Sequence, residues 1–240
     1  MKPLRSAMVL AAGLGTRMRP LTDQMPKPLV RVGGKALIDW GLDALGDAGV
    51  EQAVVNVHYL PDMLIDHLRD RHEPRIIISD ERHDLLDSGG GIAKALSFFG
   101  GEPFYVLNAD TFWIDREASN LERLALEWDA DAMDILVLLA EPSHATGHTG
   151  TLDFVMNSDG QLQRAKGASQ GYIYAGAAIL DPRVFDDAPA GAYSLNLHFD
   201  RAIAGGRMFG LVLDGHWLTV GTPDAIEPAE GILQRLNKVS

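Results

Sequence analysis

A short apolar run that leads directly into a glycine-rich loop constrains the fold of this chain most strongly. Met8, Val9 and Leu10 form the run, and Ala-Ala-Gly-Leu-Gly-Thr-Arg follows at residues 11–17. Glycine has no Cβ, so backbone N–H groups in such a loop can approach an anion closely. The pattern predicts a strand followed by a phosphate-binding loop. Taken alone, the two glycines would also suit an ordinary turn.

Cations follow the loop at short spacing. Arg17 and Arg19 come directly after the glycines, and Lys27 stands between Pro26 and Pro28. Guanidinium groups suit phosphate oxygens and an ammonium group acts as a point charge, so these residues predict a polyphosphate site. The loop differs from the Walker A motif, because no Gly-Lys-Ser or Gly-Lys-Thr ending follows its glycines.

The chain as a whole is acidic, with 33 Asp and Glu against 21 Lys and Arg, which gives a formal net charge of −12. Such a surface repels nucleic acid and anionic membranes, so we expect neither as a partner. Four basic residues nevertheless gather early in the chain: Arg17, Arg19, Lys27 and Arg31. They indicate a focused anion site, although a basic loop that faces solvent would show the same cluster.

Composition also limits the compartment and the chemistry. The chain has no cysteine, which excludes disulfide bonds and cysteine-bound metals. No apolar run approaches the roughly 20 residues that span a bilayer. Residues 1–6 contain no charged-then-apolar signal segment. We therefore expect a cytoplasmic enzyme.

Strands and helices alternate through the first part of the chain. Apolar runs predict strands at residues 53–57, 76–79, 103–107 and 133–139, and helical spacing predicts helices at residues 36–48, 62–71, 89–99 and 121–128. This alternation predicts an α/β fold, a Rossmann-like and mostly parallel sheet with helices on both faces. Ligands of such sheets lie beyond the carboxyl ends of the strands, where the glycine-rich loop, Glu81 and Asp110 all fall.

The pattern changes in the second part of the chain. Residues 151–156 and 161–164 predict a β-hairpin around Asn-Ser-Asp-Gly, and further strands are predicted at residues 172–180 and 208–213. A short helix is predicted at residues 200–204 and a closing helix at residues 223–240. These elements make the sheet mixed and add a small antiparallel lobe. We expect a single domain over residues 1–240, because the sequence contains no repeat and no low-complexity linker.

The segment from Leu10 to Thr22, followed by Pro-Lys-Pro, resembles the signature of the sugar-1-phosphate nucleotidyltransferases. These enzymes join a nucleoside triphosphate and a sugar 1-phosphate into a nucleotide sugar. The resemblance covers nearly the whole chain and implies a nucleotide-binding half at about residues 1–140 and a sugar-binding half at about residues 141–222. It also implies that Arg17 and Lys27 are catalytic and stabilise charge as pyrophosphate leaves. The nucleotide-binding residues that we expect are Ala11, Ala12, Gly13, Gly15, Thr16, Arg17, Lys27, Asn56, Glu81, Gly90, Gly91 and Asn108.

Asp110 follows the apolar residues 104–107, and the resemblance implies that it is catalytic and holds Mg²⁺ together with phosphate oxygens. An aspartate that only caps a turn would look the same. The family usually supplies a second aspartate in Trp-x-Asp-x-Gly-Thr, where this chain has Trp-Leu-Thr-Val-Gly-Thr and Thr219 replaces the carboxylate. Either Asp110 works with phosphates and water, another acid such as Asp200 or Asp214 contributes, or catalysis is slow or lost.

The segment Asp-Ser-Gly-Gly-Gly-Ile-Ala-Lys at residues 87–94 resembles a second glycine motif of the family, whose backbone contacts the pyrimidine base. Gly91 stands at the matching position. Glu81 is a candidate acceptor for the imide N–H of uracil or thymine, which cytosine lacks at that ring nitrogen. Three glycines that merely open a helix, beside a solvated glutamate, would give the same pattern.

For the sugar 1-phosphate, the resemblance points to Gly150 and, on the opposite strand, Gly176. Many relatives carry a Glu-Lys pair before that strand, where this chain has Arg-Ala-Lys-Gly at residues 164–167. Lys166 or Arg164 is then the candidate phosphate cation, although a charged hairpin edge would look similar. Asn196 is a candidate for contacts with sugar hydroxyl or acetamido groups.

Within the family, the short chain and the strings Ser-Leu-Asn at residues 194–196 and Asp-Arg-Ala-Ile at residues 200–203 look most like the uridylyltransferases of cell-wall recycling. The resemblance implies UTP and N-acetylmuramate 1-phosphate as substrates. Thymidylyl or guanylyl transfer to glucose or mannose 1-phosphate is an alternative, and a non-catalytic nucleotide-sugar binding module is another. We expect small-molecule substrates only, and a monomer or a weak homodimer.

Overall fold

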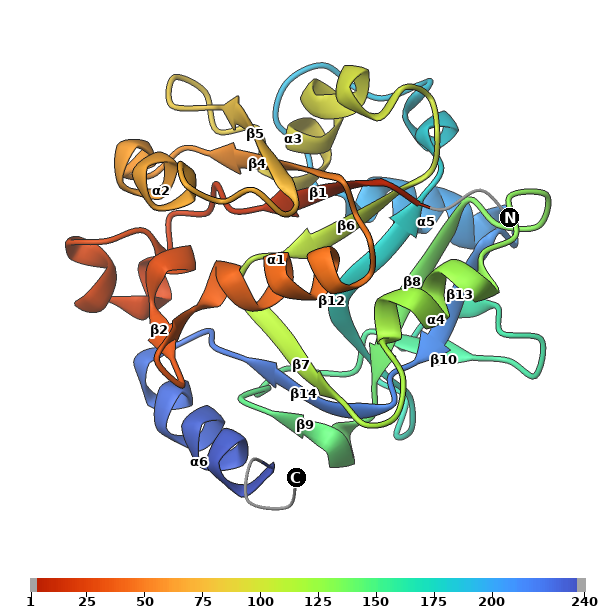
Figure 1. The fold of residues 1–240 in the computed structure, drawn as a ribbon. Helices are drawn as coiled ribbons and strands as arrows, with labels where there is room; N and C mark the ends of the chain where they lie inside the picture. Colours follow the sequence, from red (N-terminus) through yellow and green to blue (C-terminus); the bar gives the residue numbers. More distant parts are fainter. Residues whose placement is uncertain (1–3, 237–240) are drawn as a thin grey trace.

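Seven strands form the central sheet of the computed structural model, which describes residues 4–236 (Figure 1). Their order across the sheet is β13-β8-β12-β6-β1-β4-β5. The strands span Ser6–Leu10 (β1), Gln52–Val57 (β4), Arg75–Asp80 (β5), Phe104–Asn108 (β6), Ile135–Ala140 (β8), Ile173–Leu180 (β12) and Met208–Val212 (β13). Within the described residues, β12 alone runs against the other strands of this sheet. The prediction of a mostly parallel, mixed α/β sheet is therefore confirmed.

Helices cover both faces of the sheet, as predicted (Figure 1). The α-helices are Leu37–Asp47 (α1), Pro61–Leu68 (α2), Asp87–Ala95 (α3), Asn120–Glu127 (α4), Asn196–Ala204 (α5) and Ile226–Leu236 (α6). Side chains of a strand alternate between faces, so Val9 of β1 belongs to the apolar cluster that includes residues of α1, α2 and α4, while Met8 belongs to the cluster that includes residues of α3 and α5. None of the helices described within residues 4–236 is long and apolar enough to cross a membrane.

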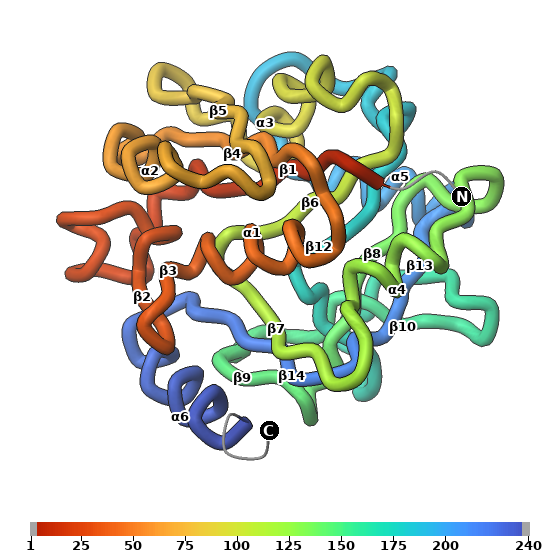
Figure 2. The backbone as a smooth tube through the Cα atoms, in the orientation of Figure 1, coloured from red at the N-terminus to blue at the C-terminus, as the bar shows by residue number. Residues whose placement is uncertain are grey.

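Small sheets lie beside the main one. They are built from Thr111–Asp115 (β7), Gly215–Thr219 (β14) and Ala145–Thr146 (β9), from the hairpin Phe154–Met156 (β10) and Leu162–Arg164 (β11), and from Arg31–Val32 (β2) and Lys35–Ala36 (β3). Helix α6 packs near β2 at the lower left of Figure 2, where Ala229 and Leu233 join a cluster with Val32 and Phe112. The predicted closing helix is thus present from Ile226, and its last predicted residues, 237–240, lie outside the described part of the chain.

Single turns of 3-10 helix connect many of these elements. They are Thr16–Met18 (η1), Leu21–Asp23 (η2), Lys27–Leu29 (η3), Leu96–Phe99 (η4), Pro142–His144 (η5), Pro182–Phe185 (η6) and Pro223–Ala225 (η7).

Five of the described strands were not predicted from the sequence: β2, β3, β7, β9 and β14. Strand β7 begins directly after Asp110, and β14 pairs with it in antiparallel register, from Thr111 opposite Thr219 to Asp115 opposite Gly215. Helix α5 is also longer than predicted, because it begins at Asn196 rather than at Asp200. The pairing of β7 with β14 joins residues about a hundred positions apart, which a local pattern cannot reveal.

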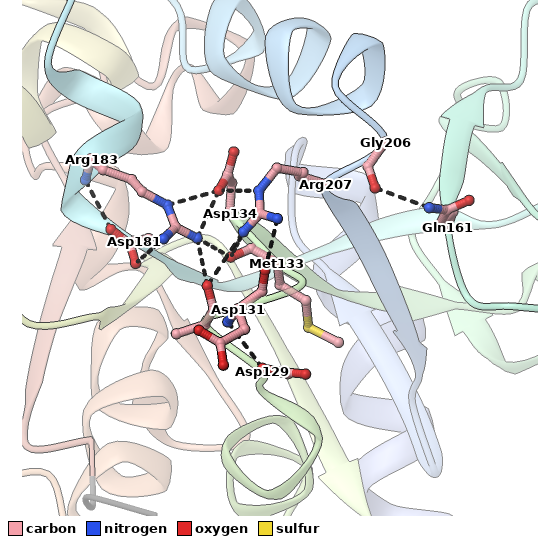
Figure 3. Close-up of polar contacts among 10 residues, drawn as sticks. Asp129, Asp131, Met133, Asp134, Gln161, Asp181, Arg183, Gly206 and Arg207 are labelled. Carbon is pink, nitrogen blue, oxygen red and sulfur yellow. Dashed lines mark hydrogen bonds and ion pairs between the residues drawn. The ribbon is translucent and has the colours of Figure 1, made fainter.

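A cluster of two arginines and one aspartate joins three neighbouring strands at one side of the sheet, β13, β8 and β12 (Figure 3). The Nε atoms of Arg183 and Arg207 donate to the same oxygen, Asp134 Oδ1, at 2.8 and 2.7 Å. Both guanidinium groups also donate to the carbonyl oxygens of Ala130 and Met133. The cluster therefore joins the loop before β8, the segment after β12 and the residue before β13.

We predict that Asp134→Ala lowers the free energy of unfolding by about 2 kcal/mol, because a hydrogen bond to a charged group contributes about 1.5–3 kcal/mol and the two guanidinium groups would then face each other. Urea denaturation measures this change. Glu117→Ala removes an exposed carboxylate and serves as the control. An equal, small effect of both substitutions would show that the cluster does not stabilise the sheet.

Candidate active site

A cleft of about 510 Å³ opens at the carboxyl ends of β1 and β6. The predicted site residues Ala11, Ala12, Gly13, Lys27, Asn56, Asn108 and Asp110 line it. Sequence analysis missed the other lining residues, which are Leu10, Pro28, Leu85, Asp87, Ser88, Ala109 and Ala192. The site thus lies where parallel strands of an α/β sheet place their ligands.

The two glycines of the first loop have different physical reasons to be glycine. Gly15 has a left-handed backbone (φ 62°), and a Cβ there would lie 2.9 Å from Lys27 Cβ. Thr22 Oγ1 donates to the Gly15 carbonyl oxygen at 2.8 Å and holds this turn. A Cβ on Gly13 would meet no described atom within 4 Å. Gly15 is therefore required by the fold, whereas Gly13 leaves space in the cleft.

An ion pair lies in the cleft. Lys27 Nζ is 2.6 Å from Asp110 Oδ2, and the two side chains are 11% and 34% exposed. The backbone fixes Asp110 from both sides, since Ala109 N–H donates to the Leu10 carbonyl oxygen and Val220 N–H donates to that of Asp110. A cation for phosphate and a carboxylate for a divalent metal are therefore adjacent.

Asn56 and Glu81 lie beneath the cleft, with only 3% and 2% of their surface exposed. Asn56 Oδ1 accepts from Ala11 N–H at 2.7 Å, and its Nδ2 donates to Glu81 Oε1 at 2.9 Å. A Cβ on Gly91 would lie 2.8 Å from both Asn56 Nδ2 and Glu81 Oε1. The structure thus brings these three predicted residues together, and Asn56 is the one that also lines the cleft.

At each of the three glycines at the start of α3, a Cβ would collide with a different neighbour. A Cβ on Gly89 would lie 2.3 Å from the Tyr193 ring, and one on Gly90 would lie 2.4 Å from the Gly191 carbonyl oxygen. The Tyr193 carbonyl oxygen also accepts from Gly89 and Gly90 N–H. Gly90 and Gly91 therefore lie behind the cleft wall, and among the described residues of this motif Asp87 and Ser88 form its surface.

A neutral pair of side chains, Tyr193 and His198, lies behind this wall. Tyr193 Oη and His198 Nε2 lie 3.2 Å apart, within hydrogen-bond distance. Burial raises the pKa of Tyr193, and burial together with the Arg201 guanidinium lowers the pKa of His198. Both groups are therefore neutral near pH 7.

The predicted sugar-phosphate residues fall in three places. Gly176 lies in an irregular stretch of β12 with φ 79°, where a Cβ would lie 2.3 Å from Thr111 Oγ1 and 3.2 Å from Asn108. It therefore packs beside the segment that contains Asp110. Such irregularities often re-aim strands next to functional sites. Gly150 lies instead beside His148, whose Cε1 would be 3.0 Å from a Cβ at Gly150.

Lys166 and Asn196 line a separate groove of about 720 Å³ with Arg164 and Asp200. Arg164 donates to Asn196 Oδ1 and to Asp200 Oδ1, each at 2.8 Å. The described residues that line this groove and those that line the cleft are different sets. It stays a prediction that Lys166 and Asn196 in this groove bind the sugar 1-phosphate together with residues of the cleft.

Arg17 is exposed and lies near the segment that replaces the family's second aspartate, since a Cβ on Gly221 would be 3.8 Å from Arg17 Nη1. Thr219 pairs with Thr111, the residue after Asp110. Of the two acids that were alternatives for the missing carboxylate, Asp200 binds Arg164, and Asp214 precedes the end of β14 that is opposite to Thr219. Within residues 4–236, no group of three or more acidic, histidine or cysteine side chains could hold a metal ion.

Comparison with known proteins identifies this arrangement. The nucleotidyl transferase family matches residues 6–234 of the chain. The chain belongs to this family.

Two similar nucleotidyltransferases are named N-acetylmuramate alpha-1-phosphate uridylyltransferase. The protein of Caulobacter vibrioides is 46% identical over 95% of this chain and 96% of its own length. That of Neisseria meningitidis is 35% identical over 94% of this chain and 97% of its own length. Among solved structures, HddC from Yersinia pseudotuberculosis complexed with GMP-PN superposes with a TM-score of 0.76 and 25% identity, over 96% of this chain and 100% of its own.

Members of the nucleotidyltransferase family generally use a divalent metal ion. Asp110 fits that use, since its carboxylate is partly exposed in the cleft and carboxylate oxygens are preferred ligands of hard cations. One carboxylate is few for such an ion. Substrate oxygens and water would therefore supply the remaining ligands.

We predict that Gly13→Ala changes the free energy of unfolding of this nucleotidyltransferase by less than about 0.5 kcal/mol, while its methyl group weakens nucleoside triphosphate binding about tenfold or more. Gly91→Ala should behave differently and lower stability by about 1–3 kcal/mol, because its Cβ overlaps two buried polar groups. Urea denaturation and titration calorimetry measure the two quantities. Equal stability losses in both variants would contradict the distinction between the two glycines.

Proposed function

We propose that this chain transfers the uridylyl group of UTP to N-acetylmuramate 1-phosphate, forming UDP-N-acetylmuramate and pyrophosphate. The observation that carries the proposal is the cleft in which the glycine-rich loop meets Lys27 and Asp110. The names of the two similar enzymes support the choice of substrates. Peptidoglycan recycling is the process that such a reaction would serve.

The chemistry is a displacement at phosphorus. An oxygen of the sugar phosphate attacks the α-phosphorus of UTP, a new P–O bond forms, and the bond from the α-phosphorus to the bridging oxygen breaks. The electron pair of that bond leaves with pyrophosphate. Because the sugar phosphate is the nucleophile, the protein need not supply one. Lys27 and Arg17 offset the negative charge that gathers on the phosphates.

The glycine-rich loop, Thr16 and Asn108 are proposed to bind UTP. Asn56 contributes indirectly, because its Oδ1 accepts from Ala11 N–H of that loop. Gly90, Gly91 and Glu81 lie behind the part of the cleft where the base is proposed to bind. Mg²⁺ held by Asp110 and phosphate oxygens would neutralise charge and align the reacting groups.

The sugar 1-phosphate is proposed to bind against the second part of the chain, through Gly150, Lys166, Gly176 and Asn196. The place of Gly176 beside Asn108 and Thr111 supports an acceptor position next to Asp110. Arg164 adds a cation to the neighbouring groove that contains Lys166.

We further propose that residues 1–140 form the nucleotide half and residues 141–222 the sugar half of one domain, closed by the final helix. The same proposal treats the protein as a cytoplasmic enzyme, monomeric or weakly dimeric, that acts on small molecules.

We predict that UTP with N-acetylmuramate 1-phosphate and Mg²⁺ gives the fastest pyrophosphate release in a matrix of nucleoside triphosphates and sugar 1-phosphates. Lys27→Ala and Asp110→Ala should each lower kcat/KM by about a hundredfold or more, because Lys27 offsets phosphate charge and Asp110 would hold the metal ion that also does so. Lys35→Ala is the control, since Lys35 pairs with Asp43. Preference for another substrate pair would retain the chemistry but discard these substrates.

A non-catalytic nucleotide-sugar binding module is the second candidate, and Thr219 favours it because a neutral hydroxyl replaces a carboxylate beside the Asp110 segment. This candidate predicts UDP-sugar binding without pyrophosphate release at any Mg²⁺ or Mn²⁺ concentration. Thr219→Asp should then raise metal affinity in calorimetry. An active wild type would exclude this second candidate.

A further inference from the structure

The carboxylate of Glu81 lies at the centre of a buried hydrogen-bond chain that connects the two walls of the cleft. Its Oε1 accepts from Asn56 Nδ2 at 2.9 Å, and its Oε2 accepts from Leu86 N–H at 3.2 Å. Asn56 in turn accepts from Ala11 N–H at 2.7 Å. Both carboxylate oxygens therefore have donors inside the protein, and the residue is only 2% exposed.

The charge of Glu81 decides how the Asn56 amide is oriented. A carboxylate only accepts hydrogen bonds, so the NH₂ end of Asn56 must face Glu81 and its oxygen must face Ala11 N–H. A neutral amide at position 81 could donate to the Asn56 oxygen instead. The amide of Asn56 would then turn its NH₂ group toward Ala11 N–H, where two donors would oppose each other in a buried place.

Glu81 also holds the opposite wall through Leu86. The backbone N–H of Leu86 is bound by Glu81, and its neighbours Leu85 and Asp87 both line the cleft. Gly91 leaves no side chain between Glu81 and Asn56. The glycine-rich loop and the wall before α3 are therefore placed by one buried carboxylate.

We propose that Glu81 is a positioning residue that sets both walls of the nucleotide cleft through Asn56 and Leu86, without itself contacting the base. The inference rests on the nucleotide site of the proposed function and deepens it. It differs from direct acceptance of the uracil imide N–H by Glu81, because a base contact affects nucleobase affinity alone. Positioning affects whatever binds the glycine-rich loop.

Inorganic tripolyphosphate separates these roles, because it has phosphates for the loop but no base. Calorimetry of Glu81→Gln with Mg²⁺ should show UTP and tripolyphosphate binding weakened by the same factor, about tenfold or more, as expected for a misplaced buried donor. Loss of UTP affinity with unchanged tripolyphosphate affinity would overturn the proposal, and so would no loss for either probe.

The exchanged pair, Asn56→Asp with Glu81→Gln, is the matched second test. The glutamine amide introduced at position 81 can donate to one oxygen of the new aspartate and accept from Leu86 N–H, while the other aspartate oxygen accepts from Ala11 N–H, so every bond of the chain is restored. We expect this pair to recover most of the affinity that each single variant loses. A folded exchanged pair that stays as weak as Glu81→Gln contradicts the proposal.

The readouts keep this inference separate from the proposed function. Thermal unfolding of each variant shows whether weak binding reflects an unfolded protein. A wild type that binds tripolyphosphate but releases no pyrophosphate would remove the proposed reaction while leaving the positioning role testable. A wild type that binds UTP but not tripolyphosphate would show that the affinity for UTP comes from its nucleoside, and this result would overturn the positioning role.

Discussion

The hydrogen-bonded register of β1 between β4 and β6 is the constraint on which the site depends. Because all three strands are parallel, their carboxyl ends meet at one edge, with Leu10 opposite Asn108. That edge brings the glycine-rich loop, Asn56 and the Asp110 segment into hydrogen-bond range. The apolar residues on both faces of β1 hold this register, since a shift by one residue would exchange its buried faces.

Much of this arrangement follows from local sequence patterns. Apolar runs and helical spacing predict the sheet, and the loop after β1 together with Asp110 predicts the edge where the site lies. The patterns do not predict β7 and β14, because these strands pair across about a hundred residues. Nor do they show that Gly89, Gly90 and Gly91 each clear a different neighbour, since those neighbours come from other segments.

Charge is distributed unevenly across the site. Lys27 and Asp110 already pair in the cleft, while Thr219 adds no second carboxylate beside them. The protein therefore places one carboxylate, that of Asp110, beside Lys27, and the phosphates of the substrates carry most of the negative charge. Because a single carboxylate binds a divalent ion weakly, a site of this kind would take up such an ion together with its substrate.

The three glycines at the start of α3 have a consequence for protein engineering. Each is held by a separate steric requirement, so substitutions there would disturb the scaffold before they altered which base is accepted. Two residues outside the motif, Leu85 and Ala192, are exposed and line the cleft. A library that varied these two positions and left residues 87–91 intact would explore nucleotide preference at little cost in folding.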